Sequence, residues 1–126
     1  MERFLSDKIF WSYDYEVSQR SSINDIASLF SGFPPFHIHE GEIILTKNGL
    51  FITGDIELQI PLYELTQISL GFDDIFPRTL AKNGGLFWQP LRIVYREQTI
   101  YAIIDYNMFG TKNQLWFEAL KELLSE

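Results

Sequence analysis

Apolar and polar side chains alternate along much of the chain after residue 36, and this pattern constrains the fold more than any other feature. In Ile56–Ile60 and in Ile68–Phe72, every second residue is apolar and the residues between are polar or glycine. Successive side chains of a β-strand point to opposite faces, so such segments bury one face and leave the other in water. Further strand-like runs cover Glu42–Thr46, Leu50–Thr53, Leu91–Arg96 and Thr99–Tyr106. The pattern predicts an antiparallel sheet with one wet face.

Short turns are predicted where these runs meet. Lys47-Asn48-Gly49 separates two of the runs, and Asn-Gly tolerates the positive φ angles of tight hairpins. Glu97-Gln98 is the predicted tight connection between the last two strands. Pro61 ends the run before it, because proline cannot donate a hydrogen bond to a neighbouring strand. These connections indicate strands that follow one another as antiparallel neighbours.

The end of the chain predicts an amphipathic helix. Thr111-Lys112-Asn113-Gln114 has the form of a capping box, in which the Thr111 hydroxyl and the Gln114 side chain bond backbone N–H groups that the first turn leaves free. Four apolar residues then follow at helical spacing: Trp116, Ala119, Leu120 and Leu123. Such a stripe predicts that one face of the helix packs on the sheet, with Trp116 in the core.

The first 35 residues carry different signals. Trp11–Val17 alternates between apolar and polar residues and predicts a half-exposed strand. Ser21–Phe30 changes to helical spacing, with Ser22 as a capping residue and Pro34-Pro35 shortly after its end. This segment predicts a short helix.

Composition narrows both the class and the partners of the protein. With 126 residues, 46% of them hydrophobic, the chain is expected to form one domain over residues 1–126. The absence of cysteine excludes disulfides and thiolate metal sites and agrees with a cytoplasmic protein. A net charge of −7 repels phosphate backbones and anionic lipids, so nucleic-acid binding and stable membrane association are not expected.

Two stretches of the chain resemble a known family. Leu115-Trp116-Phe117-Glu118-Ala119-Leu120-Lys121 is similar to the closing helix of pleckstrin-homology-like domains, whose Trp packs into the open end of the sheet. Glu42–Leu70, with its hairpin and its Ile60-Pro61-Leu62, is similar to bacterial members of that family and to the related GRAM group. The resemblance covers residues 37–125 and leaves residues 1–35 as an N-terminal strand and helix extension.

This resemblance implies a mainly β fold with some α. The expected architecture is a bent antiparallel sheet, or partly open barrel, of about seven strands, capped by one C-terminal amphipathic helix. The short N-terminal helix would be added to this core.

The phosphoinositide headgroup, the best-known ligand of the family, is not expected to bind here. Family members that bind it gather several Lys and Arg residues in the hairpin of their first strands. In this chain that hairpin contributes only Lys47, and the next basic residue is Arg78. Recognition of several phosphates needs several converging charged donors. Peripheral membrane or headgroup binding is therefore only an alternative function, by analogy of fold.

No catalytic motif or phosphate loop appears in the sequence, so we expect a protein without enzymatic activity and without a cofactor. Asp73-Asp74 could be paired catalytic carboxylates, but adjacent side chains usually point apart and a solvated turn is favoured. His37 and His39 would share one face of an extended segment and could hold a metal or small ligand together with Glu42 or a residue of another strand. Polar residues at a strand entrance are the favoured reading, because a metal needs three or four fixed ligands.

The segment Asp73–Pro90 is the main candidate for a contact site, because it is long for a connection in a compact domain. The predicted contact residues are Ile75, Phe76, Pro77, Arg78 and Lys82. Phe87 and Trp88 either join this exposed patch or begin the next strand and pack inside, and the second alternative is favoured. We expect a non-catalytic interaction module that binds a protein or peptide through this loop or through a sheet edge. Free edges would also allow two copies to associate.

Overall fold

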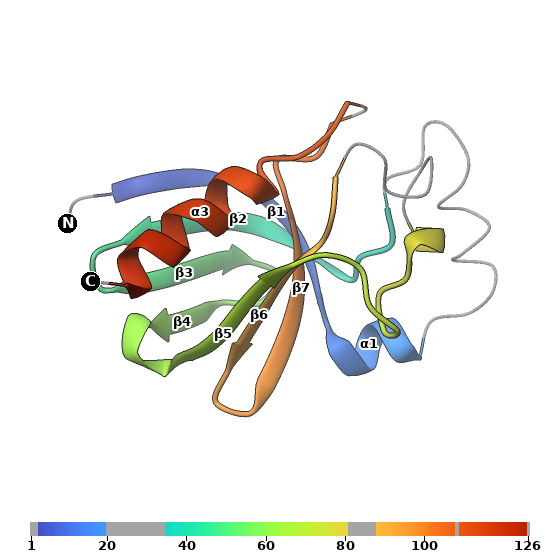
Figure 1. Ribbon diagram of the computed structural model, residues 1–126, viewed down its shortest axis with the longest axis horizontal. Helices are drawn as coiled ribbons and strands as arrows, with labels where there is room; N and C mark the ends of the chain where they lie inside the picture. The colour runs from blue at the N-terminus through green and yellow to red at the C-terminus, as the bar shows by residue number, and fades with distance from the viewer. Residues whose placement is uncertain (1–2, 20–34, 81–87, 108, 126) are drawn as a thin grey trace.

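The computed structural model describes residues 3–19, 35–80, 88–107 and 109–125. Within these ranges the strands are β1 (Arg3–Tyr13), β2 (His39–Thr46), β3 (Gly49–Gly54), β4 (Leu58–Pro61), β5 (Leu65–Leu70), β6 (Leu91–Tyr95) and β7 (Gln98–Ile104). They form one antiparallel sheet in the order β4-β3-β2-β1-β7-β6-β5, as Figure 1 shows. The sheet curls through 245° into a half-barrel. The predicted mainly β fold with a bent antiparallel sheet is confirmed.

Short and long helices accompany the sheet. The C-terminal helix α3 (Asn113–Leu124) packs on the half-barrel, and a short helix α1 (Asp14–Ser18) follows β1 (Figure 1). Single 3-10 turns, η1 (Leu62–Glu64) and η2 (Arg78–Leu80), precede and follow β5. The helix predicted over Ser21–Phe30 lies outside the described residues.

The prediction of a strand over Trp11–Val17 is wrong at both ends. The strand begins at Arg3 and ends at Tyr13, after which the chain turns into α1. Local hydrogen bonds favour that turn, because the Glu16 carboxylate accepts the Tyr13 N–H at 2.8 Å. β1 also has a more central place than an extension would: it pairs with β2 on one side and with β7 on the other.

The two predicted tight turns are present, with differences in detail. In the β2–β3 hairpin Thr46 pairs with Gly49, and the positive φ angle of 153° lies at Gly49 rather than at Asn48. A Cβ at Gly49 would lie 2.2 Å from the carbonyl oxygen of Ile60 on the neighbouring strand β4, so this position requires glycine. The β6–β7 turn lies one residue earlier than predicted, at Arg96 and Glu97, with φ angles of 45° and 64°.

The half-barrel encloses an apolar core that we call the inner core. Its buried residues are Ile9, Trp11, Ile43, Leu45, Leu50, Ile52, Ile60, Leu65, Leu91, Ile93, Tyr95, Ile100, Ala102, Ile104, Trp116 and Leu120. The predicted stripe of α3 faces this core, and the indole N–H of the fully buried Trp116 donates to Asp7 Oδ2 at 2.9 Å. The prediction that Trp116 lies in the core is confirmed.

The predicted capping box at the start of α3 is wrong. Thr111 Oγ1 accepts the N–H of Asn113 at 3.1 Å, but Gln114 donates to Glu118 within the helix instead of bonding back. The Asn113 side chain, which is buried, accepts the Ile104 N–H at 2.8 Å and donates to the Ala102 carbonyl at 3.1 Å. The helix start is therefore fixed by contacts with β7 that local spacing does not reveal.

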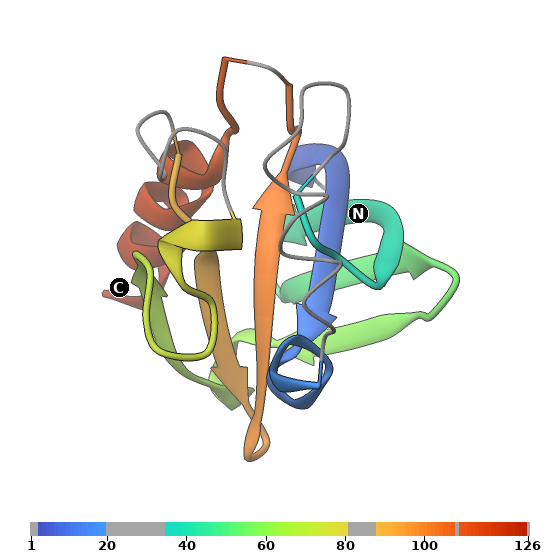
Figure 2. The ribbon, with the colours of Figure 1, turned by 90° about the vertical axis from the view of Figure 1, so that its right-hand side faces the viewer.

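A second apolar layer, the outer cluster, covers the other face of β7. Its buried residues are Val17, Phe36, Phe76, Leu80, Trp88, Tyr101 and Ile103. Figure 2 shows α1 on one side of β7 and the segment of residues 71–80 on the other. Trp88 packs inside, as the favoured alternative predicted, since it is only 8% exposed, but it does not begin the next strand, because β6 starts at Leu91. Phe87 lies outside the described residues.

Candidate binding site

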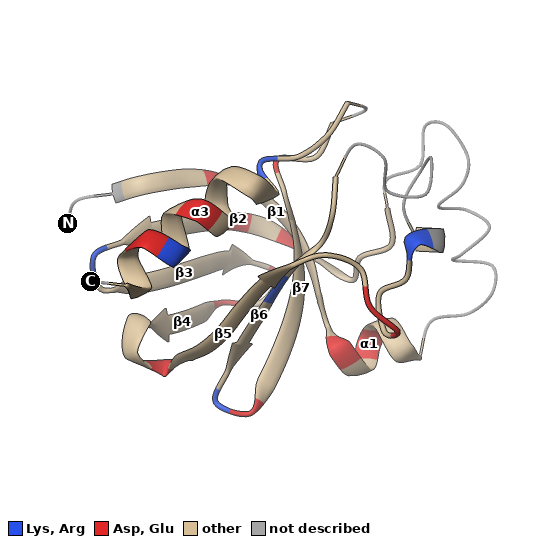
Figure 3. Cartoon of the chain, viewed as in Figure 1, with Lys and Arg blue, Asp and Glu red and all other residues tan. Residues whose placement is uncertain are grey.

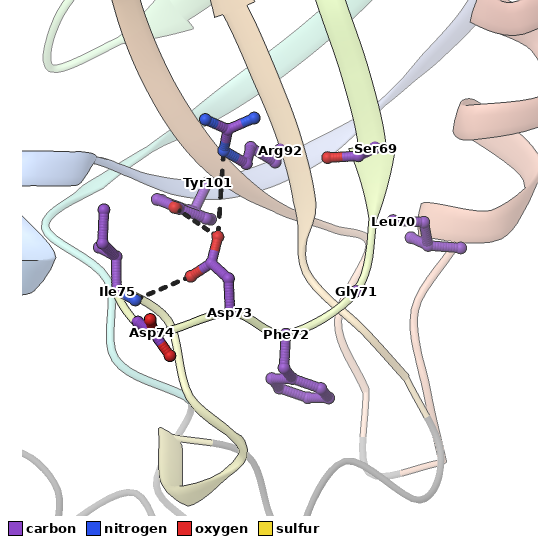
Figure 4. Close-up of a pocket in the computed structure, with 9 residues that line it drawn as sticks. All are labelled: Ser69, Leu70, Gly71, Phe72, Asp73, Asp74, Ile75, Arg92 and Tyr101. Carbon is purple, nitrogen blue, oxygen red and sulfur yellow. Dashed lines mark hydrogen bonds and ion pairs between the residues drawn. The ribbon is translucent and has the colours of Figure 1, made fainter.

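The candidate site is a hollow of about 470 Å³ at the end of β5. Four elements contribute to it: the last residues of β5, the turn that follows, and the neighbouring β6 and β7 (Figure 4). Its lining residues are Ser69, Leu70, Gly71, Phe72, Asp73, Asp74, Ile75, Arg92 and Tyr101. The hollow thus lies at the start of the long segment that the sequence indicates as a contact site.

Asp73 holds the turn that forms one wall of the hollow. Its Oδ1 accepts the backbone N–H groups of Ile75 at 2.9 Å and Phe76 at 2.7 Å. Its Oδ2 accepts the hydroxyl of Tyr101 at 2.7 Å. Asp side chains commonly close turns in this way by accepting backbone N–H groups two or three residues on. One carboxylate therefore fixes the turn and joins it to β7.

The opposite wall of the hollow is formed by residues that strand pairing places side by side. Ser69 pairs with Arg92, and Arg92 pairs with Tyr101, so the three residues form a row across β5, β6 and β7. Arg92 donates from Nη1 to Gln67 Oε1 at 3.0 Å, and its Nε lies 3.9 Å from Asp73 Oδ2. Burial, and then the bond to Asp73, raise the pKa of the Tyr101 phenol, so this hydroxyl remains a donor at neutral pH.

The outer edge of β5 leads into this hollow. No strand among the described residues pairs with that edge, since β5 ends the sheet. Ile68 and Leu70 are half-buried against the inner core, and α3 packs beside β5. Phe117 of α3 is also half-buried against the inner core, and the Lys121 ammonium lies 5.9 Å from its ring centroid. An unpaired strand edge thus lies beside apolar side chains.

The five predicted contact residues have different places. Ile75 lines the hollow, but Phe76 is only 1% exposed and belongs to the outer cluster, so it does not offer a surface contact. Pro77 is half-buried and Arg78 is exposed. Lys82 lies outside the described residues. Of the four predicted contact residues that the structure describes, only Ile75 lines the hollow.

Phe76 and Arg78 contact side chains that line the hollow. The Phe76 ring stacks on the Tyr101 ring with centroids 5.6 Å apart. The Arg78 guanidinium lies 5.1 Å from the centroid of the Phe72 ring. Asp73 and Asp74 project to different sides of the turn in Figure 4, as expected for a turn rather than for paired catalytic carboxylates.

Sequence reasoning missed Arg92 and Tyr101. Arg92 and Tyr101 alternate along β6 and β7 with residues that enter the inner core, so their side chains face away from that core. This alternation is the only feature of the sequence that could have indicated them. Their approach to Asp73 depends on the register of three strands and on the turn after β5, which a pattern along the chain does not contain.

The two histidines turn to different partners. The ring nitrogens of His39 lie 2.7 Å from Asp55 Oδ2 and 2.9 Å from both carboxylate oxygens of Glu16. The His37 ring stacks on Phe10 at a centroid distance of 4.0 Å. Among the described residues, no group of three or more His, Asp or Glu side chains is arranged to hold a metal ion. A shared ligand of His37 and His39 gains no support from this arrangement.

A second hollow, of about 480 Å³, lies at the other edge of the sheet. It borders β4 and η1, and its lining residues are Lys47, Asn48, Phe51, Gln59, Ile60, Pro61, Leu62 and Tyr63. This hollow provides a comparison for the site at β5.

No known protein family and no curated protein matches the chain in sequence. None of the described helices is both long and apolar enough to cross a membrane.

Proposed function

We propose that the protein is a non-catalytic interaction module that binds an extended peptide along the outer edge of β5, with one peptide side chain in the hollow of residues 69–75. The observation that carries the proposal is the continuity between the two features. The edge of β5 has no strand partner among the described residues, and its last residues, Ser69 and Leu70, line the hollow.

Backbone pairing would supply affinity and the hollow would supply selectivity. An exposed edge offers N–H and C=O groups that an incoming strand can pair, and each such hydrogen bond contributes roughly 0.5–1.5 kcal/mol. Half-buried Ile68, Leu70 and Phe117 would be covered further by the peptide, which adds an apolar contribution. Alternate side chains of the peptide would face the protein, as in any added strand.

The β4 edge is less suited to the same role. β4 has four residues and ends in Pro61, which cannot donate to a neighbouring strand. The carbonyl oxygen of Gln59 on β4 already accepts a hydrogen bond from Arg96 at 3.4 Å. β5 is longer, with six residues, and ends in the hollow instead of in a proline. The two edges therefore differ in how much backbone they can offer.

The distribution of charge favours a peptide over a lipid headgroup. Lysines and arginines of the described residues are spread over the fold rather than gathered at one hairpin (Figure 3). Arg96 is paired with Glu64, and Lys112 is paired with Asp7 and Asp105. Headgroup recognition needs several free cations at one place.

Selection from a displayed library of random peptides tests the proposal. We expect binders whose addition shifts the backbone amide NMR signals of residues 65–75 and of α3, but not those of β4. Ser69→Trp should fill the hollow at β5 and weaken binding at least tenfold. Gln59→Trp, which fills the hollow at β4, is the matched control and should leave affinity unchanged.

Two outcomes would reject this function. The site would not be at β5 if selected peptides shifted the amide NMR signals of β4 and η1. The same would follow if the peptides bound the Ser69→Trp variant with unchanged affinity. Binding of the protein to phosphatidylserine vesicles, in the absence of any selected peptide, would favour the membrane alternative instead.

A further inference from the structure

His39 joins three parts of the fold through carboxylates. Its Nδ1 meets Asp55, in the turn after β3, and its Nε2 meets Glu16, on α1. The ring is largely buried, with 8% of its side chain exposed, and lies 4.3 Å from the Trp11 ring and 6.0 Å from the Tyr13 ring. Glu16 is also well shielded, with 18% of its side chain exposed, whereas Asp55 is half exposed.

With both carboxylates ionised, both contacts are satisfied only when each ring nitrogen of His39 carries a hydrogen. A carboxylate only accepts hydrogen bonds, and a neutral imidazole can donate from one nitrogen alone. In the neutral ring, one nitrogen lone pair would face a carboxylate at less than 3 Å. The positive ring satisfies both contacts and also stands against two aromatic rings, which attract a cation.

Three elements packed around His39 contribute titratable groups. The hydrogen bond to His39, and then the backbone N–H of Glu40, lower the pKa of Asp55, while desolvation opposes them. The titratable groups that face the ring are Glu16 from α1, Asp55 from the turn and the Tyr13 phenol from β1. The Glu40 side chain on β2 faces His37 instead, at 3.5 Å.

The same contacts lead to the candidate binding site. Glu16 belongs to α1, and Val17 of that helix lies in the outer cluster together with Phe76 and Tyr101. Those two residues support the Asp73 turn, through backbone and hydroxyl donors respectively. The position of α1 is therefore connected, through one packed layer, to the wall of the hollow.

We propose that doubly protonated His39 is a clamp that holds α1 against the sheet, and that loss of one ring proton to solvent releases α1 and loosens the turn of residues 73–76. This regulation rests on the proposed peptide site, because that site is what the turn would control. The geometry fixes the direction of the pH effect. The hollow is well formed at pH values below the transition, where His39 carries both hydrogens, and is loosened at pH values above it.

NMR of the free protein, without peptide, tests the clamp as pH is raised from about 6 to about 9. We expect the ¹⁵N signals of His39 to show hydrogens on both nitrogens at the start. The amide signals of Asp14–Ser18 and of residues 73–76 should then move in one transition with the His39 ring. His37, in the same molecule, is the internal control, and any change at its ring should leave the α1 amide signals in place.

Substitutions at Asp55 and at His39 itself sharpen the test. Asp55→Asn, at the half-exposed partner, should move the shared transition to lower pH by removing one anion beside the ring. His39→Gln should hold the α1 amides at their high-pH positions throughout the range. A neutral His39 ring near pH 7, or α1 amides that do not follow the ring, would overturn the clamp and leave the peptide test on Ser69→Trp unaffected.

Discussion

The two faces of β7 carry apolar layers of different construction. Ile100, Ala102 and Ile104 enter the inner core, where strands and α3 surround them. Tyr101 and Ile103 enter the outer cluster, where the short α1 and irregular segments cover them. Regular elements carry continuous backbone hydrogen bonds, whereas the outer cover depends on side chains such as Asp73. We therefore expect the layer that carries the candidate site to open locally more readily than the inner core, because side chains rather than a continuous backbone ladder hold its cover.

The largest effect is expected in the inner core. Trp116→Ala removes a fully buried indole and leaves Asp7 without its indole donor. The free energy of unfolding, measured by urea denaturation, should fall by about 3–5 kcal/mol, or the protein should fail to fold. The side chain of Leu115, on the same helix, is 49% exposed. Leu115→Ala should therefore change the free energy of unfolding by less than about 0.5 kcal/mol. Equal effects of the two substitutions would contradict the assignment of the inner core.

A smaller and more local effect is expected in the outer cluster. Asp73→Ala leaves the Tyr101 hydroxyl and the Phe76 N–H without their acceptor, which should cost about 1–3 kcal/mol. Hydrogen exchange should accelerate in residues 71–80 before it does so in β1, β2 and β7. Asp74→Ala is the matched control and should leave the exchange pattern unchanged. Uniform acceleration over the whole sheet would show that the two layers open together.

The smallest effect is expected at low pH, at the contact between His39 and Asp55. Because the folded protein lowers the pKa of Asp55 below its ordinary 3.8, the bond to His39 stabilises the fold fully above that value. The stabilisation is lost as pH falls through the lower pKa of the folded state. Stability measured against pH should therefore decline less steeply below about pH 4 in Asp55→Asn than in the unmodified protein. An unchanged decline would mean that this pair does not contribute to acid unfolding.

The inner core could be predicted from sequence because its determinants are periodic. Residues such as Leu58, Ile60 and Ile68 repeat at the spacing of two that a strand requires, and the Trp116 stripe repeats at the spacing of a helix. The α1 helix could not be predicted, since Tyr13, Tyr15 and Val17 continue the alternation of β1. The Glu16 carboxylate ends the strand by accepting the Tyr13 N–H and by its hydrogen bond with the His39 ring. The contact with His39 is a tertiary contact, which the local sequence does not reveal.

The candidate site could be predicted only in its position along the chain. The length of the Asp73–Pro90 segment indicated the region, and Ile75 does line the hollow. The burial of Phe76 could not be foreseen, because an apolar residue in a loop has no periodic neighbours that would assign it a face. The convergence of Ser69, Arg92 and Tyr101 requires the register of three strands, which only the folded sheet defines.

The central place of β1 has a consequence for how the chain folds. Trp11 of β1 pairs with His39 of β2 on one side and with Ala102 of β7 on the other. The sheet around β1 is therefore complete only after β7 has formed. β1–β4 can assemble from early sequence, but one edge of β1 then stays open until β7 is available. Contacts of such long separation slow folding, and an open edge invites pairing with other chains in the meantime. Newly made copies are thus expected to be most prone to aggregation in the interval before β7 joins β1.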